Sequence, residues 1–262
     1  MSNRSFFWRH VRAPLLLFAL MAGVLATTPL DRQIAHTLFF DEAHSRWLGA
    51  GTWWANALIH KGGAWLVRLL VVGALALWVT TYIKPGLATW RRPALYFAVS
   101  TLLGVGLVGL LKALTNVDCP WDLTEFGGRF SFIDLFEHRP VAWRRAQCFP
   151  SGHASAGYAL LALYFTFRER SRRAGQFGLL AGLAVGLIFG LAQQSRGAHF
   201  LSHDVWSAML VWTAELALYT FAFKARLWDR SQWESNEGTA ASRLPDGGTC
   251  SLPPSAGPVA GA

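Results

Sequence analysis

The sequence predicts an all-α fold, a polytopic membrane protein with a six-transmembrane-helix bundle. Hydrophobic residues make up 53% of the 262-residue chain, and 13 residues are tryptophan, which favours a lipid environment over an aqueous one. The formal charge of +9 comes from basic residues that lie between apolar runs rather than on one soluble face. Anionic lipid headgroups are therefore the expected partner, and no nucleic acid is expected.

Six apolar stretches approach the ~20 residues that a helix needs to cross a bilayer. They are Ala13–Leu30, Gly63–Tyr82, Ala94–Leu114, His153–Phe167, Gly175–Gln194 and Asp204–Phe223. The fourth stretch is the shortest. The first could also be the core of a signal peptide, but no small-x-small cleavage site followed by a soluble domain appears, so a retained span is expected.

The basic residues predict the orientation of these spans. They cluster at residues 4–12, 84–92, 168–173 and 224–230, which fall on one side of the membrane if all six stretches cross it. The protein is expected to be a multi-pass protein of a bacterial inner membrane. By the positive-inside rule, both of its termini are expected in the cytoplasm. The segments between the other span ends then face the periplasm, and all candidate chemistry lies in them.

The expected domain organisation is simple. Residues 1–228 form one membrane domain, with its core at 94–223, and residues 229–262 have the Ser, Gly, Pro and Ala content of a disordered cytoplasmic tail. The aromatic and small residues of 31–62 suit short helices at the membrane interface, and no chemistry is assigned to them.

The segment Pro150-Ser151-Gly152-His153 carries the first candidate site. Pro150 and Gly152 break regular structure, and the apolar run after His153 predicts a helix. The unpaired N–H groups and the dipole at this helix start favour an anion, Ser151 supplies a hydroxyl, and His153 can transfer a proton. The alternative is a capped helix with an ordinary histidine.

Two further groups of chemical residues leave the membrane on the same side. Lys112 lies near the outer end of the third span, where an ionisable group is costly unless it has a function or reaches the interface. The segment 195–204 contains Arg196, His199, His203 and Asp204. Together these residues suit phosphoryl transfer, since cations and amides neutralise phosphoryl oxygens while one imidazole attacks phosphorus and another donates a proton.

These motifs resemble those of the type 2 phosphatidic acid phosphatase superfamily of integral membrane lipid phosphatases. That family carries Lys-x6-Arg-Pro, Pro-Ser-Gly-His and Ser-Arg-x5-His-x3-Asp motifs on a six-helix core, and the resemblance covers about 94–223. It implies that His153 is the general acid and that Ser151 and Gly152 bind phosphate. It also implies that His199 is the nucleophile and becomes a phosphohistidine.

The first and third motifs depart from the family pattern. Cys119 stands where the first motif has an arginine. Counting back from His199 puts Gln193 at the arginine position of the third motif, so Arg196 is taken as a substitute phosphate ligand beside Lys112. The arginine pair at 144–145 either restores the missing charge or belongs to a solvated loop.

The group that orients His199 is open between two neighbours. Counting forward from His199 puts His203 at the position of the family's aspartate, with Asp204 one residue later. Taking His203 as the nucleophile instead would leave Ser207 at the aspartate position. His199 is therefore kept as the nucleophile, with Asp204 or His203 holding its second ring nitrogen.

Two alternatives concern the same residues. Cys119 and Cys148 flank the first two motifs on the expected periplasmic side, where they either form a disulfide or remain separate thiols. His199 and His203 are four residues apart and, with Asp204 and with His153 as a further candidate ligand, could hold a divalent metal. No metal or other cofactor is expected, because phosphoryl chemistry can proceed through histidine alone.

The sequence thus predicts an enzyme that hydrolyses a phosphate monoester or diphosphate of a lipid at the periplasmic face. Lipid A, undecaprenyl diphosphate, phosphatidylglycerol phosphate and phosphatidic acid all fit. A lipid phosphotransferase and a catalytically inactive anion-binding or transport protein are the alternatives. The lipid and the oligomeric state do not follow from the sequence.

Overall fold

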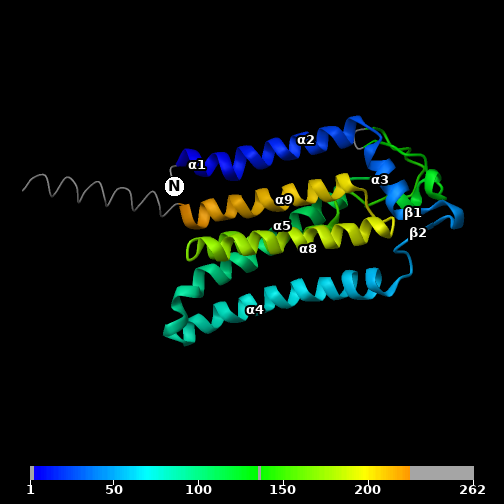
Figure 1. Cartoon of the computed structure of the whole chain (residues 1–262). Coiled ribbons are helices and arrows are strands. Elements are labelled where there is room, and N and C mark those ends of the chain that lie inside the picture. The colour runs from blue at the N-terminus through cyan, green and yellow to red at the C-terminus, as the bar shows by residue number, and fades with distance from the viewer. Residues whose placement is uncertain (1–2, 135–136, 225–262) are drawn as a thin grey trace, which may run out of the picture. The chain divides into compact units, whose positions relative to one another are not determined.

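The computed structural model describes residues 3–134 and 137–224, and this part of the chain is mainly helical (Figure 1). Residues 1–222 form one compact unit by themselves. The expected tail at 229–262 lies outside the described residues.

The N-terminal helix combines three segments without a break: α1 (Asn3–Phe7), a π-helical turn (Trp8–Arg12) and α2 (Ala13–Thr27). A shorter helix and a hairpin follow: α3 (Leu30–Phe39), β1 (Phe40–Asp41), a 3-10 turn (Glu42–His44) and β2 (Arg46–Trp47). The two strands pair antiparallel, with Phe40 opposite Trp47. The all-α prediction is therefore right for the bundle, but it missed this small hairpin.

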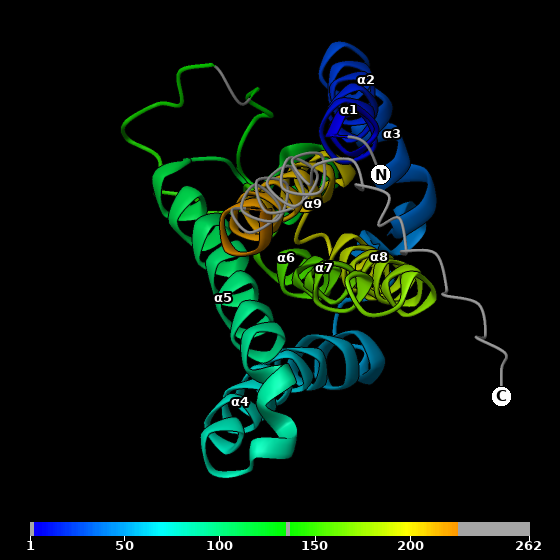
Figure 2. The ribbon, with the colours of Figure 1, turned by 90° about the vertical axis from the view of Figure 1, so that its left-hand side faces the viewer.

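The remaining elements build the bundle. Its helices are α4 (Gly63–Ile83), α5 (Arg91–Leu114), α6 (Gly152–Tyr158), α7 (Ala162–Arg168), α8 (Arg172–Ser195) and α9 (Leu201–Tyr219). π-Helical segments at Trp54–Gly62 and Thr220–Lys224, and 3-10 segments at Pro85–Trp90, Pro120–Asp122, Thr124–Phe126 and Ala159–Leu161, complete the helical structure. Seen along the bundle, α6 and α7 lie among α5, α8 and α9, while α4 packs against the side of α5 (Figure 2).

Within the described residues, five helices are long and apolar enough to cross a membrane, rather than the six predicted. They are Ser5–Thr27, Trp54–Ile83, Pro85–Leu114, Arg172–Ser195 and Leu201–Phe223. The predicted fourth span corresponds to the shorter α6 and α7, which a 3-10 turn at Ala159–Leu161 separates. The second span also begins nine residues earlier than predicted, because the π-helical segment Trp54–Gly62 runs directly into α4.

The α6–α7 segment is the most deeply buried part of the bundle, and glycines let it approach α8. A Cβ atom added to Gly182 would lie 2.5 Å from the backbone nitrogen of Leu161, and one added to Gly186 would collide with the ring of Tyr158. The contact partners move back along α6–α7 as the glycines advance along α8, so the two segments are antiparallel. In lipid there is no hydrophobic driving force between helices, so the interface depends on close packing, which these small residues allow.

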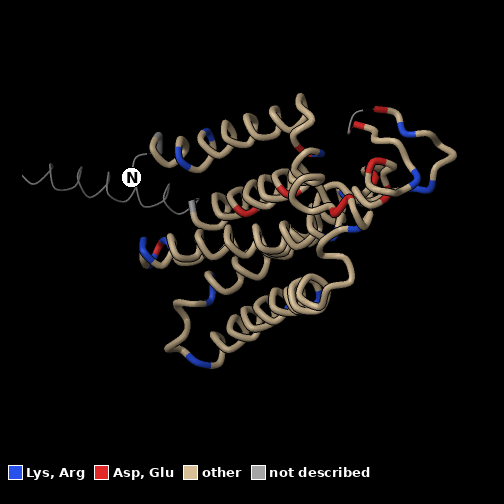
Figure 3. The backbone as a smooth tube through the Cα atoms, turned by 45° about the vertical axis from the view of Figure 1, so that its right-hand side comes forward, with Lys and Arg blue, Asp and Glu red and all other residues tan. Residues whose placement is uncertain are grey.

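The charges divide between the two ends of the bundle. Figure 3 shows Lys and Arg at the end where α4 and α7 finish, whereas most Asp and Glu lie at the opposite end together with other basic residues. The end at which α4 and α7 finish is therefore the more basic of the two.

The close approach at Gly182 gives a test of the packing. Gly182→Ala should destabilise the protein by about 1–3 kcal/mol, because the added methyl group meets backbone atoms of Leu161 that cannot move aside. The apparent melting temperature in detergent measures this change. The matched control is Gly106→Ala on α5, where an added Cβ meets nothing within 4 Å. Equal melting temperatures for the two variants would contradict the proposed interface.

Candidate active site

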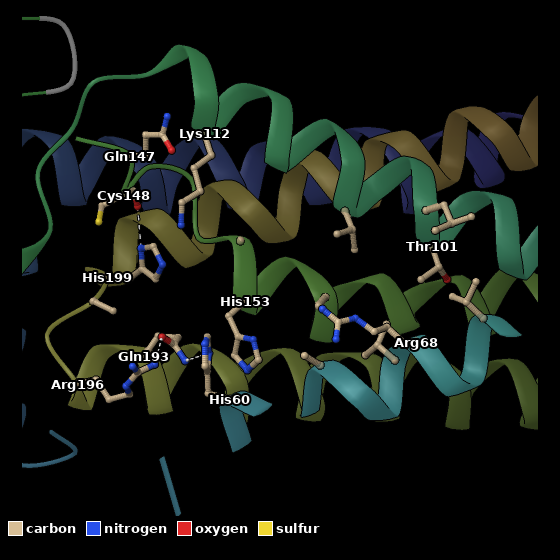
Figure 4. A pocket seen from close by; sticks show the side chains of 18 of the residues that line it. His60, Arg68, Thr101, Lys112, Gln147, Cys148, His153, Gln193, Arg196 and His199 are labelled. Carbon is tan, nitrogen blue, oxygen red and sulfur yellow. Dashed lines mark hydrogen bonds between the residues drawn. The ribbon is translucent and has the colours of Figure 1, made fainter. Parts of the chain in front are cut away.

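A cavity of about 870 Å³ lies where α5 and α8 end and α6 begins, and α4 closes one side of it (Figure 4). Five of the predicted catalytic and phosphate-binding residues line this cavity: Lys112, Gly152, His153, Arg196 and His199. The cavity continues between α4 and α5 past apolar side chains that include Val67, Val71, Leu102 and Val105. One end of the cavity is therefore polar and cationic, and the other end is apolar.

His199 is held by the main chain of the Pro-Ser-Gly-His segment. Its Nδ1 lies 2.7 Å from the carbonyl oxygen of Cys148. A carbonyl can only accept, so Nδ1 carries the hydrogen of the neutral imidazole, and Nε2 keeps a free lone pair. Burial lowers the pKa of His199 well below its ordinary value of 6.5, and His203 and Lys112 act in the same direction. His199 is therefore neutral near pH 7, as a nucleophile must be.

The two candidates for orienting His199 occupy different positions. Nδ1 of His203 lies 3.3 Å from Nδ1 of His199. The carboxylate of Asp204 instead accepts a hydrogen bond of 2.6 Å from Gln194, and it packs against Gly190, where an added Cβ would collide with it. In this structure His203 and the Cys148 carbonyl surround Nδ1 of His199, and Asp204 supports α8.

Ser151 lies behind the wall of the cavity. It is fully buried, and its carbonyl oxygen accepts a hydrogen bond of 2.9 Å from Ser207. The next residue, Gly152, does line the cavity. A Cβ placed on it would be 3.7 Å from Nζ of Lys112. The start of α6 therefore presents backbone to the cavity directly beside a cation.

His153 lies at the first turn of α6 between two other rings. Its ring stacks on Phe189, with centroids 4.6 Å apart, and lies 4.5 Å from the ring of His60. Nε2 of His153 is 3.1 Å from the carbonyl oxygen of Ile59, to which it donates. Nδ1 is therefore the nitrogen of neutral His153 that can accept a proton or, after protonation, donate one.

Three side chains form a hydrogen-bonded chain at the position where the third motif was expected to have an arginine. Arg196 donates to Oε1 of Gln193 at 3.0 Å, so the amide nitrogen of Gln193 faces the other way. That nitrogen lies 3.2 Å from Nδ1 of His60 and donates to it. Nδ1 of His60 is then an acceptor, and the ring hydrogen belongs on Nε2. His60 is thereby prepared as a neutral hydrogen-bond donor.

His60 and Arg68 also line the cavity, and neither was predicted from the sequence as a site residue. Residues 31–62 were assigned no chemistry, yet His60 enters the site because the π-helical segment continues α4 outward. Arg68 lies inside an otherwise apolar span. An ionisable residue within a span is by itself a signal of function, and this signal could have identified Arg68.

The arginine pair 144–145 does not line this cavity. Both side chains are exposed, and Arg145 donates a hydrogen bond to the carbonyl oxygen of Ala113 at the end of α5. A cation at this position complements the unpaired carbonyl groups and the dipole of the helix end. Arg145 therefore serves the C-terminus of α5, and Arg196 is the arginine beside Gln193.

Two buried links hold the loop that supplies the Cys148 carbonyl. A disulfide joins Cys119 to Cys148, whose Cα atoms are 5.2 Å apart. Beside it, Arg139 forms a bidentate ion pair with Asp118, with distances of 2.7 and 2.8 Å. The two side chains are 4% and 6% exposed, so removing either partner would leave an uncompensated buried charge.

The outer segment supports the turn that carries His199. Asp31 accepts a hydrogen bond of 3.0 Å from the backbone nitrogen of Ser202 and so caps α9, and burial raises the pKa of its carboxyl. Gly197 has a φ of +72°, and a Cβ on it would collide with the indole of Trp47. Two residues from the segment that was assigned no chemistry, Asp31 and Trp47, therefore fix the position of the turn that carries His199.

Within the described part of the chain, no group of three or more His, Cys, Asp and Glu side chains is arranged to hold a metal ion. The fold and the site together define a helical protein with five helices apolar enough to cross a membrane, among its described residues, and a cavity lined by cations and imidazoles. The family model of the PAP2 superfamily matches residues 93–227, which is just over half of the 262 residues. The chain belongs to this superfamily, as the motifs predicted, and its members are generally phosphatases. No curated protein and no solved structure gave a match.

The burial of neutral His199 predicts how stability depends on pH. Because the folded-state pKa of His199 lies below the unfolded value, the unfolded chain binds a proton that the folded chain does not as the pH falls below 6.5. Wild type should therefore lose up to about 1.4 kcal/mol per pH unit at this residue.

His199→Gln should remove this part of the pH dependence, so that the apparent melting temperature falls less steeply between pH 7 and pH 5. His138→Gln, which changes an exposed histidine, should keep the wild-type slope. Identical slopes for all three proteins would show that His199 is not buried in its neutral form.

Proposed function

We propose that this protein is a membrane lipid phosphatase that hydrolyses a phosphate monoester or diphosphate of a lipid through a phosphohistidine at His199. The main support is the hydrogen bond from Nδ1 of His199 to the Cys148 carbonyl. It leaves Nε2 as a lone-pair donor beside a cavity lined by Lys112, Arg196 and His153. This combination supplies a nucleophile, phosphate ligands and a proton donor within one site.

Binding of the phosphoryl group comes first. Lys112 and Arg196 neutralise its equatorial oxygens, and the backbone N–H groups at the start of α6 donate to them. Ser151 is retained as a phosphate ligand on the family motif alone, because its own backbone N–H donates to the carbonyl oxygen of His203 at 3.3 Å. His60 adds a neutral donor through Nε2, because its Nδ1 is occupied by Gln193. The chain thus meets the need for positive potential without the arginine of the family motif.

The chemical steps follow from the two imidazoles. Nε2 of His199 forms a bond to phosphorus as the bond to the lipid oxygen breaks, and protonated His153 gives its proton to that oxygen. The new phosphohistidine is cationic, and the Cys148 carbonyl with His203 stabilises its Nδ1–H. His153 then takes a proton from water, which attacks phosphorus and breaks the N–P bond. Phosphate leaves, and both histidines return to their starting states.

The apolar part of the cavity supports a lipid substrate. Side chains of α4 and α5, among them Val67, Val71 and Val105, continue the cavity away from the cations. A lipid phosphate would place its headgroup among the cations and its chain along these residues. Lipid A, undecaprenyl diphosphate, phosphatidylglycerol phosphate and phosphatidic acid remain the candidate substrates.

We place the site at the periplasmic face of a bacterial inner membrane, with both termini in the cytoplasm. The uneven charge distribution in Figure 3 supports this orientation. The antiparallel packing of α6–α7 on α8 supports a sixth crossing, since it carries the chain from the site to the opposite end of the bundle. Asp204, through Gln194, and the disulfide between Cys119 and Cys148 are proposed to hold the site together.

The central experiment measures phosphate release from a panel of lipid phosphates by the purified protein in detergent. His199→Ala and His153→Ala should each lower kcat/KM by about 100-fold or more, because each removes a group that makes or breaks a bond. The control is His138→Ala, which changes an exposed histidine outside the cavity. Labelled phosphate trapped on wild type, and absent from His199→Ala, identifies the intermediate.

Folded wild type that releases phosphate from none of the lipids would contradict a phosphatase. An anion-binding or transport protein would then be the better interpretation. Transfer of the phosphoryl group to a second lipid, in place of water, would identify a phosphotransferase.

The relay through Gln193 predicts a specific pattern of double-mutant effects. His60→Ala should lower kcat/KM by about tenfold, because one hydrogen bond to the phosphoryl group is lost. Gln193→Leu should act in the same direction by freeing His60 to adopt the other tautomer. Since both changes remove one interaction, the double variant should lose little more than the larger single loss. Fully additive losses would show that the two residues act separately.

A further inference from the structure

Arg68 is an arginine within the membrane-spanning part of α4 that the mechanism above does not use. It lies five residues after Gly63, where α4 begins, and its side chain lines the cavity. Its guanidinium lies 5.2 Å from the ring centroid of Trp65. Among the described residues no carboxylate forms an ion pair with it.

The position of Arg68 is defined by the helix that carries it. Five residues correspond to about 7.5 Å of helix rise, so the Cα of Arg68 lies below the cationic end of the cavity. Side chains on a helix lean towards its N-terminus, which for α4 is the end nearest the site. Figure 4 shows the guanidinium of Arg68 directed towards His153. Its charge therefore lies between the catalytic histidines and the apolar part of the cavity.

A charged guanidinium at this depth is costly unless an anion or water compensates it. Reaching towards the interface relieves part of this cost. Arg68 is an exposed residue, and its side chain lines the cavity in which the proposed substrate would lie. The cations around His199 already serve the phosphoryl group that is transferred. Arg68 is thus placed to meet a second anionic group, nearer to the lipid chain than the first.

We propose that Arg68 binds a second phosphoryl group on the lipid side of the one that is cleaved, so that the enzyme prefers a lipid diphosphate to the corresponding monophosphate. Arginine suits this role because its planar guanidinium donates two parallel hydrogen bonds to phosphate oxygens. The inference rests on the proposed phosphatase activity and assigns the substrate class of that same site.

The test compares farnesyl diphosphate with farnesyl phosphate, which share one chain and differ by one phosphoryl group. For wild type and Arg68→Gln, phosphate release gives kcat/KM for each compound, and the readout is the ratio of the two values. Arg68→Gln should lower this ratio by about 10- to 100-fold. Arg68→Lys should keep part of the preference, because the charge remains while the two-pronged geometry is lost.

The matched control is Lys61→Gln. Lys61 lies one residue after His60 and is exposed, and its loss changes the net charge by the same amount outside the cavity. Wild-type substrate preference in this control, together with a lowered ratio in Arg68→Gln, supports the proposal. Equal ratios in wild type and Arg68→Gln overturn it, even if both proteins are active. An equal shift in Lys61→Gln also overturns it, because general surface charge would then explain the effect.

A binding measurement separates this inference from the proposed activity. A farnesyl methylenebisphosphonate, which cannot be cleaved at its bridge, should raise the apparent melting temperature of wild type more than farnesyl phosphonate does. Arg68→Gln should lose this difference. The measurement needs no turnover, so it still decides the role of Arg68 if wild type proves inactive. The proposal is overturned if the bisphosphonate gives wild type and Arg68→Gln the same stabilisation.

Discussion

The hydrogen bond between Nδ1 of His199 and the Cys148 carbonyl is the interaction on which the rest of the site depends. It fixes the tautomer of His199, the proposed nucleophile, and it joins the turn before α9 to the loop before α6. That loop is held in turn by the disulfide of Cys148 with Cys119 and by the buried pair of Asp118 and Arg139. In many histidine sites a carboxylate holds the second ring nitrogen. A backbone carbonyl performs this task without adding a negative charge close to a bound phosphate.

The cationic part of the site shows how one lost charge can be replaced by geometry. Gln193 carries no charge, but its two ends have opposite hydrogen-bonding character, so it can accept from Arg196 and donate to His60. This places one cation and one neutral donor where a single arginine would have supplied both charge and hydrogen bonds. At the end of α5, Arg145 likewise supplies a hydrogen-bond donor, in this case to a carbonyl group that the helix leaves unpaired.

Much of this arrangement could be predicted from the sequence, because hydrophobic length and charge asymmetry act over whole segments. The motif residues Lys112, His153 and His199 were expected on one side of the membrane, and all three line one cavity. The contribution of His60 could not be predicted, because it depends on a π-helical segment that continues α4 and sets the direction of the ring. The 3-10 turn at Ala159–Leu161 could not be predicted either, because hydropathy gives the length of an apolar segment and not the type of helix that it forms.

The cavity reaches from a polar end among α5, α6 and α8 to an apolar end between α4 and α5. For a phosphatase built in this way, the two products separate into different media. If the proposed lipid phosphatase activity holds, phosphate, which is small and strongly hydrated, would depart through the cationic mouth into water, while the lipid product would stay in the hydrocarbon beside α4. Neither product would have to pass the other. Phosphate is too polar to leave through the hydrocarbon, and the lipid product is too apolar to leave through the water.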